Sequence, residues 1–248
     1  MNEETLDFYK DQLKYAGFGD RLNDKLGELF ENENEKTVVF NTAIEYGKDA
    51  TAKTVNYDLR FQRSATSSLF FLNNFSAAME KTPGELVSNT FYLDRAKGIT
   101  AKEAFNLLEG RSVYKELKNK EGESYNAWVK LNPEVKDEKG NMKFSTFNDN
   151  YGYDISKSLE KIQPPDLFFN LSKEDTLKSL QKGNLVEMHT ADKTEKYFIA
   201  AEPQYKTMAI FNEAGEKQFV NNKQAASVDQ KPSLGENAGE KKTNSMKR

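Results

Sequence analysis

Two hydrophobic periods divide the first hundred residues. Over the first thirty positions, apolar side chains recur at helical spacing and predict a pair of amphipathic helices joined by a glycine-containing turn at 17–20. From 38 to 46 and from 55 to 61, apolar and polar residues alternate, which is typical of half-buried antiparallel strands. The short apolar runs 69–72 and 91–93 are expected to extend the same sheet.

A third helix should begin at Thr100. Thr100 and Glu103 have the T-x-x-E spacing of a capping box, in which each side chain accepts an otherwise unpaired amide hydrogen. Gly110 is placed to end this helix in a left-handed conformation. Strand-like runs with hairpin turns between them follow at 113–117, 125–131 and 142–147.

The chain after residue 150 is expected to form a smaller unit. Asp154 can cap a short helix, and Pro164 and Pro165 then break the chain because proline fixes its own backbone and restricts the residue before it. Ser172 is placed to cap a helix that ends at Gly183. Three strand-like runs complete the unit, at 185–190, 196–201 and 207–211.

These elements predict an α+β fold. It consists of the N-terminal helix pair, an antiparallel β-sheet with the capped helix packed on it, and a small C-terminal helix-plus-β-meander unit. The expected domains are 1–163 and 166–220, the second either docked on the first or independent. Residues 221–248 are poor in aromatic and aliphatic side chains and are expected to be a disordered tail, because they cannot bury enough apolar surface to offset the entropy of ordering.

Charge separates this tail from the rest of the chain. The 248 residues carry a net charge of -3. In the tail, five Lys and one Arg against three acidic residues give +3, so residues 1–220 carry -6. The whole molecule therefore offers no general attraction to nucleic acid or to an anionic membrane. The opening residues lack the pattern of a secretory signal, and no apolar stretch approaches the roughly 18 residues of a transmembrane helix, so we expect a cytoplasmic protein with no membrane contact.

Reactive side chains are scarce, with no Cys and a single His, His189. This excludes thiolate catalysis, disulfides and Cys-based metal sites. His189 lies in an expected strand and no G-x-S-x-G motif accompanies it, so we interpret it as structural. No phosphate loop or dinucleotide motif occurs, and no cofactor is expected. The oxygen-rich segment with Asn148, Asp149, Asn150 and Asp154 lacks the spacing of an EF-hand, and we interpret it as a turn before a helix rather than a metal site.

Basic and aromatic residues are interleaved between 92 and 120. Exposed rings beside Arg or Lys are how single-stranded nucleic acid is held, so this segment is the candidate contact for nucleic acid or a partner. The candidate residues are Tyr92, Arg95, Lys97, Arg111 and Lys115. Acidic residues interrupt the segment, which favours the alternative of a mixed solvated surface. No catalytic residue is assigned.

Several runs of residues are similar to a known family. They are GITAKEAFNLLEGRSV at 98–113, NKEG at 119–122, YNAW at 125–128, NYGYD at 150–154, LKSLQKGN at 177–184 and AEPQYKT at 201–207. Through them the chain, from Leu6 to about Phe211, resembles uncharacterised accessory proteins carried on conjugative elements of Bacteroidetes. The resemblance implies a cytoplasmic protein of a mobile genetic element, and it transfers no catalytic residue.

Three functions compete at this point. The first is a non-enzymatic interaction protein that binds a protein partner and supports maintenance, transfer or defence evasion of a mobile element. The second is a nucleic-acid-binding accessory protein that acts through the basic and aromatic segment and the basic tail. The third, an enzyme that uses only carboxylates, Tyr, Lys or Ser, is the least favoured, because no such group stands out in a chain with 39 acidic residues.

Overall fold

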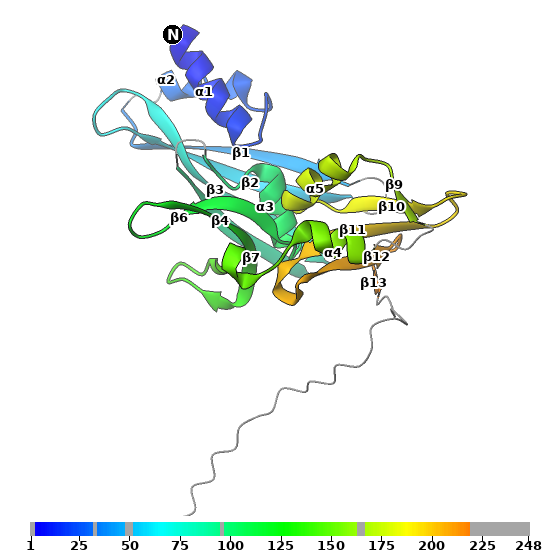
Figure 1. Ribbon diagram of the computed structural model, residues 1–248. Coiled ribbons are helices and arrows are strands. Elements are labelled where there is room, and N and C mark those ends of the chain that lie inside the picture. Colours follow the sequence, from blue (N-terminus) through cyan, green and yellow to red (C-terminus); the bar gives the residue numbers. More distant parts are fainter. Residues whose placement is uncertain (1–2, 32–33, 48–51, 95–96, 163–166, 219–248) are drawn as a thin grey trace, which may run out of the picture. The chain divides into compact units, whose positions relative to one another are not determined.

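The computed structural model in Figure 1 describes residues 3–31, 34–47, 52–94, 97–162 and 167–218. Over these ranges it contains five α-helices and three antiparallel sheets, so the expected α+β class is confirmed. Two expectations, the disordered tail at 221–248 and the chain break at Pro164 and Pro165, fall outside the described residues.

The N-terminal helix pair was only half correct. Helix α1 covers Glu3–Tyr15 as expected. In place of a second continuous helix, the chain forms the 3₁₀ turn η1 (Asn23–Lys25) and a single helical turn, α2 (Glu28–Glu31). Gly27 lies between them, and glycine is a poor helix former because it loses the most backbone freedom on ordering. The helical spacing therefore marked correctly which residues are buried, but not the backbone that buries them.

The largest sheet is a meander of consecutive strands in the order β1-β2-β3-β4-β5. The strands are β1 (Thr37–Tyr46), β2 (Lys53–Arg63), β3 (Phe70–Thr82), β4 (Glu85–Asp94) and β5 (Lys97–Gly98). Strands β3 and β4 are much longer than the apolar runs that predicted them, because their outward positions hold small polar residues that show no hydrophobic signal.

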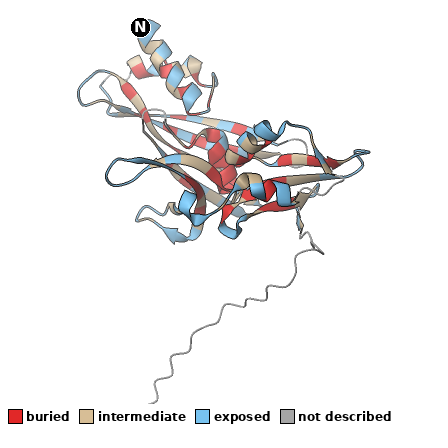
Figure 2. Ribbon diagram, in the orientation of Figure 1, coloured by how far each residue is buried: buried red, intermediate tan, exposed pale blue. Residues whose placement is uncertain are grey.

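One face of this sheet forms the main hydrophobic core. Helices α1 and α3 (Ala101–Leu108) pack on it. The Phe18 ring, from the turn after α1, meets the Tyr57 and Phe75 rings edge to face, with centroids 5.2 Å apart in each pair. Such aromatic pairs add about 1 kcal/mol beyond the burial of their area. Over the middle of β2, residues on the core face of the sheet are buried and those on the other face are exposed, and Figure 2 shows such positions alternating along the strands.

Helix α3 begins with the predicted capping box. Thr100 accepts from the amide of Glu103, and the Glu103 carboxylate accepts from the amide of Thr100. Gly110 follows the helix with a φ of +82°, as expected for the left-handed residue that ends it. Every residue of α3 except Lys102 is buried, and Figure 2 shows the helix in the buried colour. The helix is thus an internal element of the fold.

Two smaller sheets complete the described chain. The three-stranded sheet consists of β6 (Val113–Lys118), β7 (Ser124–Lys136) and β8 (Met142–Asn148). The C-terminal sheet consists of β9 (Leu167–Phe169), β10 (Val186–Thr190), β11 (Lys196–Glu202), β12 (Thr207–Asn212) and β13 (Lys217–Gln218). Helices α4 (Ile155–Ile162) and α5 (Lys173–Gln181) pack against the C-terminal sheet. The amide of Lys157 donates to Asp154 and that of Asp175 donates to Ser172, so both predicted caps are confirmed.

The C-terminal sheet shares a second core with the three-stranded sheet. Trp128, on β7, is 4% exposed and packs among Leu180, Ile199 and their neighbours. Its ring lies 5.5 Å from that of Tyr153. Residues 1–218 form one compact unit. The expected division into 1–163 and 166–220 stays a prediction, as does the ability of the second part to fold alone.

Candidate functional site

Arg111, a predicted contact residue, forms hydrogen bonds within the chain. Its guanidinium donates to the Gly183 carbonyl at 2.9 Å and to the Asn106 side-chain oxygen at 2.6 Å. Asn106 in turn donates to the Lys182 carbonyl at 2.7 Å. We call this set of residues, Asn106, Arg111, Lys182 and Gly183, the α3 junction, because it joins α3 to the end of α5. Only 11% of the Arg111 side chain is exposed.

Lys115 is also held by a residue of α3. Its ammonium lies 3.0 Å from the Glu103 carboxylate, which closes the capping box at Thr100. The side chains of Lys115 and Glu103 are 21% and 9% exposed. This ion pair therefore supports the start of α3, and a contact from Lys115 to a partner stays a prediction.

Tyr92 is the predicted residue that the structure leaves most accessible, with 58% of its surface exposed. It lies on β4 and faces away from the core. Arg95 and the side chain of Lys97, which were expected beside it, lie outside the described residues. Of the five candidates, only Tyr92 is therefore shown on the surface without a main role in packing.

A lysine distant in sequence lies beside Tyr92. The Lys139 ammonium is 3.4 Å from the Tyr92 hydroxyl and 5.9 Å from the centroid of its ring. Lys139 belongs to the turn between β7 and β8, and this turn is fixed against β4 by two hydrogen bonds. The amide of Thr90 donates to Asn141, and the amide of Met142 donates to Asn89.

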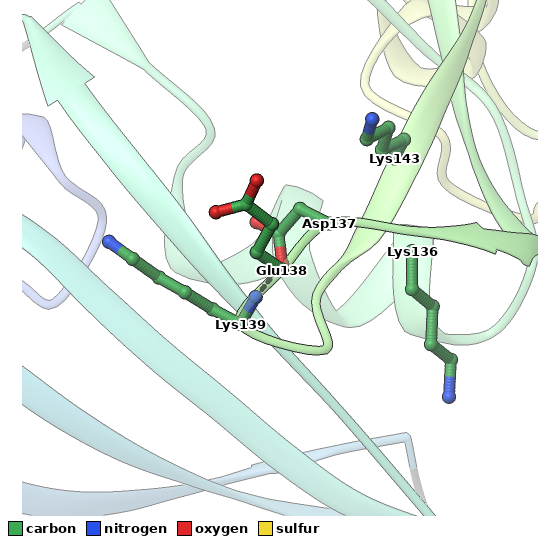
Figure 3. A pocket seen from close by; sticks show the side chains of 5 residues that line it. All are labelled: Lys136, Asp137, Glu138, Lys139 and Lys143. Carbon is green, nitrogen blue, oxygen red and sulfur yellow. Dashed lines mark hydrogen bonds between the residues drawn. The ribbon is translucent and has the colours of Figure 1, made fainter.

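The same turn borders a hollow of ≈ 340 Å³, lined by Lys136, Asp137, Glu138, Lys139 and Lys143 (Figure 3). The side chains in Figure 3 point in different directions and do not converge on a common point. Asp137 accepts from the amides of Asn141 and Lys139, which together with the Asn141 side chain and the Lys139 charge lower its pKa. The Asp137 carboxylate thus organises the turn, and the hollow lacks the convergent groups of a small-molecule site.

The second face of the largest sheet is solvent-exposed over β1, β2 and β4. We call it the open face. Its strands pair so that one cross-strand row runs Val39, Arg60, Asn74 and Tyr92. Val39 and Tyr92 are 41% and 58% exposed. Arg60 is exposed, and its guanidinium makes no hydrogen bond or ion pair with any other described residue. The row therefore presents two apolar groups and one unengaged cation.

The next row of the open face is fixed by Asp58. The side chains of Asn41 and Ser76 donate to its two carboxylate oxygens, at 2.6 and 3.3 Å. The rest of the face consists largely of Asn, Ser, Thr and Ala residues. Charged and large apolar residues also occur on it, with Glu45, Glu80 and the 75% exposed Leu86 towards one end of the strands. Arg60 and Tyr92 are the largest side chains of their own row.

No family model matches this chain, and no curated protein or solved structure matches it either. The resemblance to accessory proteins of conjugative elements stays a prediction.

Two basic residues at α3 and just after it, Lys102 and Arg111, have lowered pKa values with structural causes. Lys102 is exposed overall, but its ammonium lies 4.5 Å from the centroid of the Tyr46 ring and 4.6 Å from that of Phe105. Desolvation by these groups, aided by the Arg111 charge, lowers the pKa of Lys102 to about 8. Burial likewise lowers the pKa of Arg111 to about 10, against the opposing charge of Glu109.

Two residues considered from the sequence have local structural contacts. The Nδ1 atom of His189 lies 2.8 Å from the Thr190 carbonyl oxygen, and its ring stacks on that of Phe168. Asp149 starts the short turn η3 (Asp149–Tyr151) and accepts from the Tyr114 hydroxyl.

Within the described ranges, no group of three or more His, Asp or Glu side chains is placed to hold a metal ion. None of the described helices could cross a membrane.

Sequence reasoning missed Arg60 and Lys139. Arg60 lies at an outward position of β2, but its row partners depend on the register between strands. Lys139 is 47 positions from Tyr92, so their proximity depends on how two sheets meet. The alternation in β2 could have indicated the open face, since Asn56, Asp58 and Arg60 all point away from the core.

Proposed function

We propose that this chain is a non-enzymatic interaction protein that binds a protein partner through the open face, as an accessory factor of a mobile genetic element. The observation that supports the proposal most is the row Val39, Arg60, Asn74 and Tyr92, which runs across four strands without a covering element among the described residues. The role in maintenance, transfer or defence evasion is motivated by the resemblance in sequence.

The composition of the row suits a protein partner. Tyr and Arg are enriched among the residues that contribute most to protein–protein affinity, because they combine a large contact area with directional hydrogen bonds. Around them the face offers few charges, which the centres of interfaces also lack, and small polar groups that a partner would have to hydrogen-bond as it covers them. A rigid sheet also loses little conformational entropy on binding.

A capture experiment tests the proposal. The full chain, its Arg60→Ala/Tyr92→Ala variant and a Tyr205→Ala control are used as baits in extracts of the native host, with recovered proteins quantified by mass spectrometry. Tyr205 is a matched control because it is 65% exposed and lies in the C-terminal part of the chain. We expect a reproducible partner that the wild type and Tyr205→Ala retain and the double variant loses at least tenfold.

Recovery of the same proteins by all three baits would contradict a role for the open face. The absence of any reproducible partner would contradict the interaction function as a whole.

A second function, nucleic-acid binding, is favoured by one observation. Tyr92 has Lys139 at its ring and Arg60 in its row, which is the combination of stacking surface and cations that holds single strands. Affinity for single- and double-stranded DNA, measured over a salt series, should then fall steeply with salt because phosphate contacts release counterions. Tyr92→Ala should weaken it about tenfold, by the usual contribution of one stacked base. No binding at low salt would eliminate this function.

A further inference from the structure

Strand β1 is an edge strand with a long unpaired side. It pairs with β2 from Thr37 to Tyr46 without a shift in register. The amide of Arg63 donates to the Lys36 carbonyl, and hydrogen-bonded pairs recur at every second position along an antiparallel ladder. The backbone groups of the intervening residues therefore point away from β2. These residues are Thr37, Val39, Asn41, Ala43 and Glu45.

The two edges of the largest sheet differ in protection. At the other edge, β5 pairs with the end of β4. The β7–β8 turn also covers β4 there, because the Thr90 amide donates to the Asn141 side chain and the Met142 amide donates to the Asn89 side chain. Within the described residues, β2 is the only strand that pairs with β1. Over the described ranges, the fold thus covers the β4–β5 edge and pairs no strand with the outer side of β1.

The sequence of β1 does not prevent another strand from pairing with it. Natural edge strands avoid such pairing by short length, lysines, prolines or bulges. Strand β1 has ten residues, of which only Glu45 is charged, and no Pro or Lys. By comparison, the edge strand β6 has six residues, and Lys115, Glu116 and Lys118 are charged.

We propose that a second copy of this chain pairs with β1 in an antiparallel arrangement across a two-fold axis at Asn41. The residues that direct their backbone groups outward are centred on Asn41, so this axis aligns Asn41 with itself, Val39 with Ala43 and Thr37 with Glu45. No charged residue of β1 then faces another charged residue, which makes the strand complementary to itself. A two-fold axis is the commonest symmetry of protein dimers, and it uses one surface twice.

This arrangement has a consequence for the open face. Because the axis is perpendicular to the sheet, the open faces of both copies lie on the same side of one continuous sheet. Each row that begins at Val39 would continue into the second copy at Ala43. The dimer does not depend on the proposed partner of the open face, and its test measures self-association of the purified chain, which the capture of a host protein does not.

The absence of Cys allows a direct test of the axis. Residues in a hydrogen-bonded antiparallel pair have Cα atoms about 5.5 Å apart, within the range that a disulfide can bridge. The full-length variant Asn41→Cys should therefore form a covalent dimer under mild oxidation, at least tenfold faster than Asn56→Cys. Asn56 is the matched control, since it is an exposed Asn on the same face but on the interior strand β2.

Charge substitutions test the register. In Val39→Lys/Ala43→Lys, lysines of the two copies would face each other twice, and like charges opposite each other destabilise paired strands. Sedimentation should show a dimer dissociation constant raised at least about tenfold. In Val39→Lys/Ala43→Glu the facing charges are opposite, so the dimer should persist. Thermal unfolding checks that both variants are folded.

Three results would overturn the proposal. The first is a wild-type chain that sediments as a monomer at about 100 μM, well above the micromolar range of ordinary weak dimers. The second is equal cross-linking of Asn41→Cys and Asn56→Cys. The third is equal dissociation of both charge variants, which would place any dimer contact in another register or surface. A monomeric chain whose β1 variants lose a host protein would assign the edge to a strand of that protein.

Discussion

Arg111 at the α3 junction and Arg60 on the open face are the same residue type in opposite settings. Arg111 donates two hydrogen bonds within the chain and has 11% of its side chain exposed. Arg60 is exposed, and its side chain makes no hydrogen bond or ion pair with another described residue. Two arginines that look alike in the sequence therefore differ in the structure: one joins two parts of the fold, and the side chain of the other is exposed, where we propose that it contacts a partner. Substitutions in each region should separate these roles.

The largest effect is expected from Arg111→Met. The variant keeps the packing of the side chain on Phe105 but leaves the Asn106 oxygen and the Gly183 carbonyl without their donor. Buried groups that lose a charged partner cost about 3 kcal/mol, so the free energy of unfolding should fall by roughly that amount in urea denaturation. Arg60→Met serves as the control. A loss below about 1 kcal/mol for Arg111→Met would contradict the role of the junction.

Gly183→Ala should have the next largest effect. Gly183 has a φ of +76°, and a Cβ atom there would lie 2.8 Å from the Ser112 carbonyl oxygen. We expect a loss of about 2 kcal/mol in unfolding free energy, from the left-handed backbone and the close approach together. Gly122→Ala is the matched control, because its φ is +85° but nothing lies within 4 Å of the added atom. Gly122→Ala should lose about 1 kcal/mol of unfolding free energy. Equal losses in the two variants would contradict a steric contribution from the Ser112 carbonyl at Gly183.

Lys102→Met should have a smaller effect on the free energy of unfolding, and this effect should depend on pH. Its pKa is about 8 in the folded chain and 10.5 when unperturbed, so between these values the unfolded chain binds more protons. Stability therefore rises with pH across this window in the wild type relative to Lys102→Met. Urea unfolding at pH 7.5 and 10 measures the difference. If the difference in unfolding free energy between the wild type and Lys102→Met were the same at both pH values, it would contradict the lowered pKa.

The smallest effect on stability is expected on the open face. Arg60→Ala and Tyr92→Ala should each change the free energy of unfolding by less than about 0.5 kcal/mol, as surface substitutions usually do. The same variants should weaken binding to the partner, which capture or titration measures. A large loss of stability in either variant would show that the residue supports the fold and would weaken its assignment as a contact.

Local signals in the sequence predicted individual elements well. The capping box at Thr100, the glycine at 110 and the caps at Asp154 and Ser172 all act between residues close in sequence, so the pattern alone defines them. The second N-terminal helix was wrong because apolar spacing records burial, whereas Gly27 decides the backbone. The full lengths of β3 and β4 were missed because their outward residues are polar.

The candidate site was less predictable than the fold. Arg111 and Tyr92 looked equivalent in the sequence, since both are near acidic and basic neighbours. Their difference depends on Gly183, 72 positions from Arg111, and on Lys139, 47 positions from Tyr92. Such contacts follow from how sheets and helices meet, and no spacing rule in a single sequence encodes them.

The order of strands has a consequence for how the chain is made. Each of the three sheets consists of strands that are consecutive in the sequence. Contacts between residues close in sequence form quickly, and during synthesis the N-terminal parts of a chain fold first. The largest sheet can therefore assemble on the ribosome before the C-terminal sheet exists. Gly183 is synthesised about seventy residues after Arg111, so the α3 junction can close only after the whole of the largest sheet has been made.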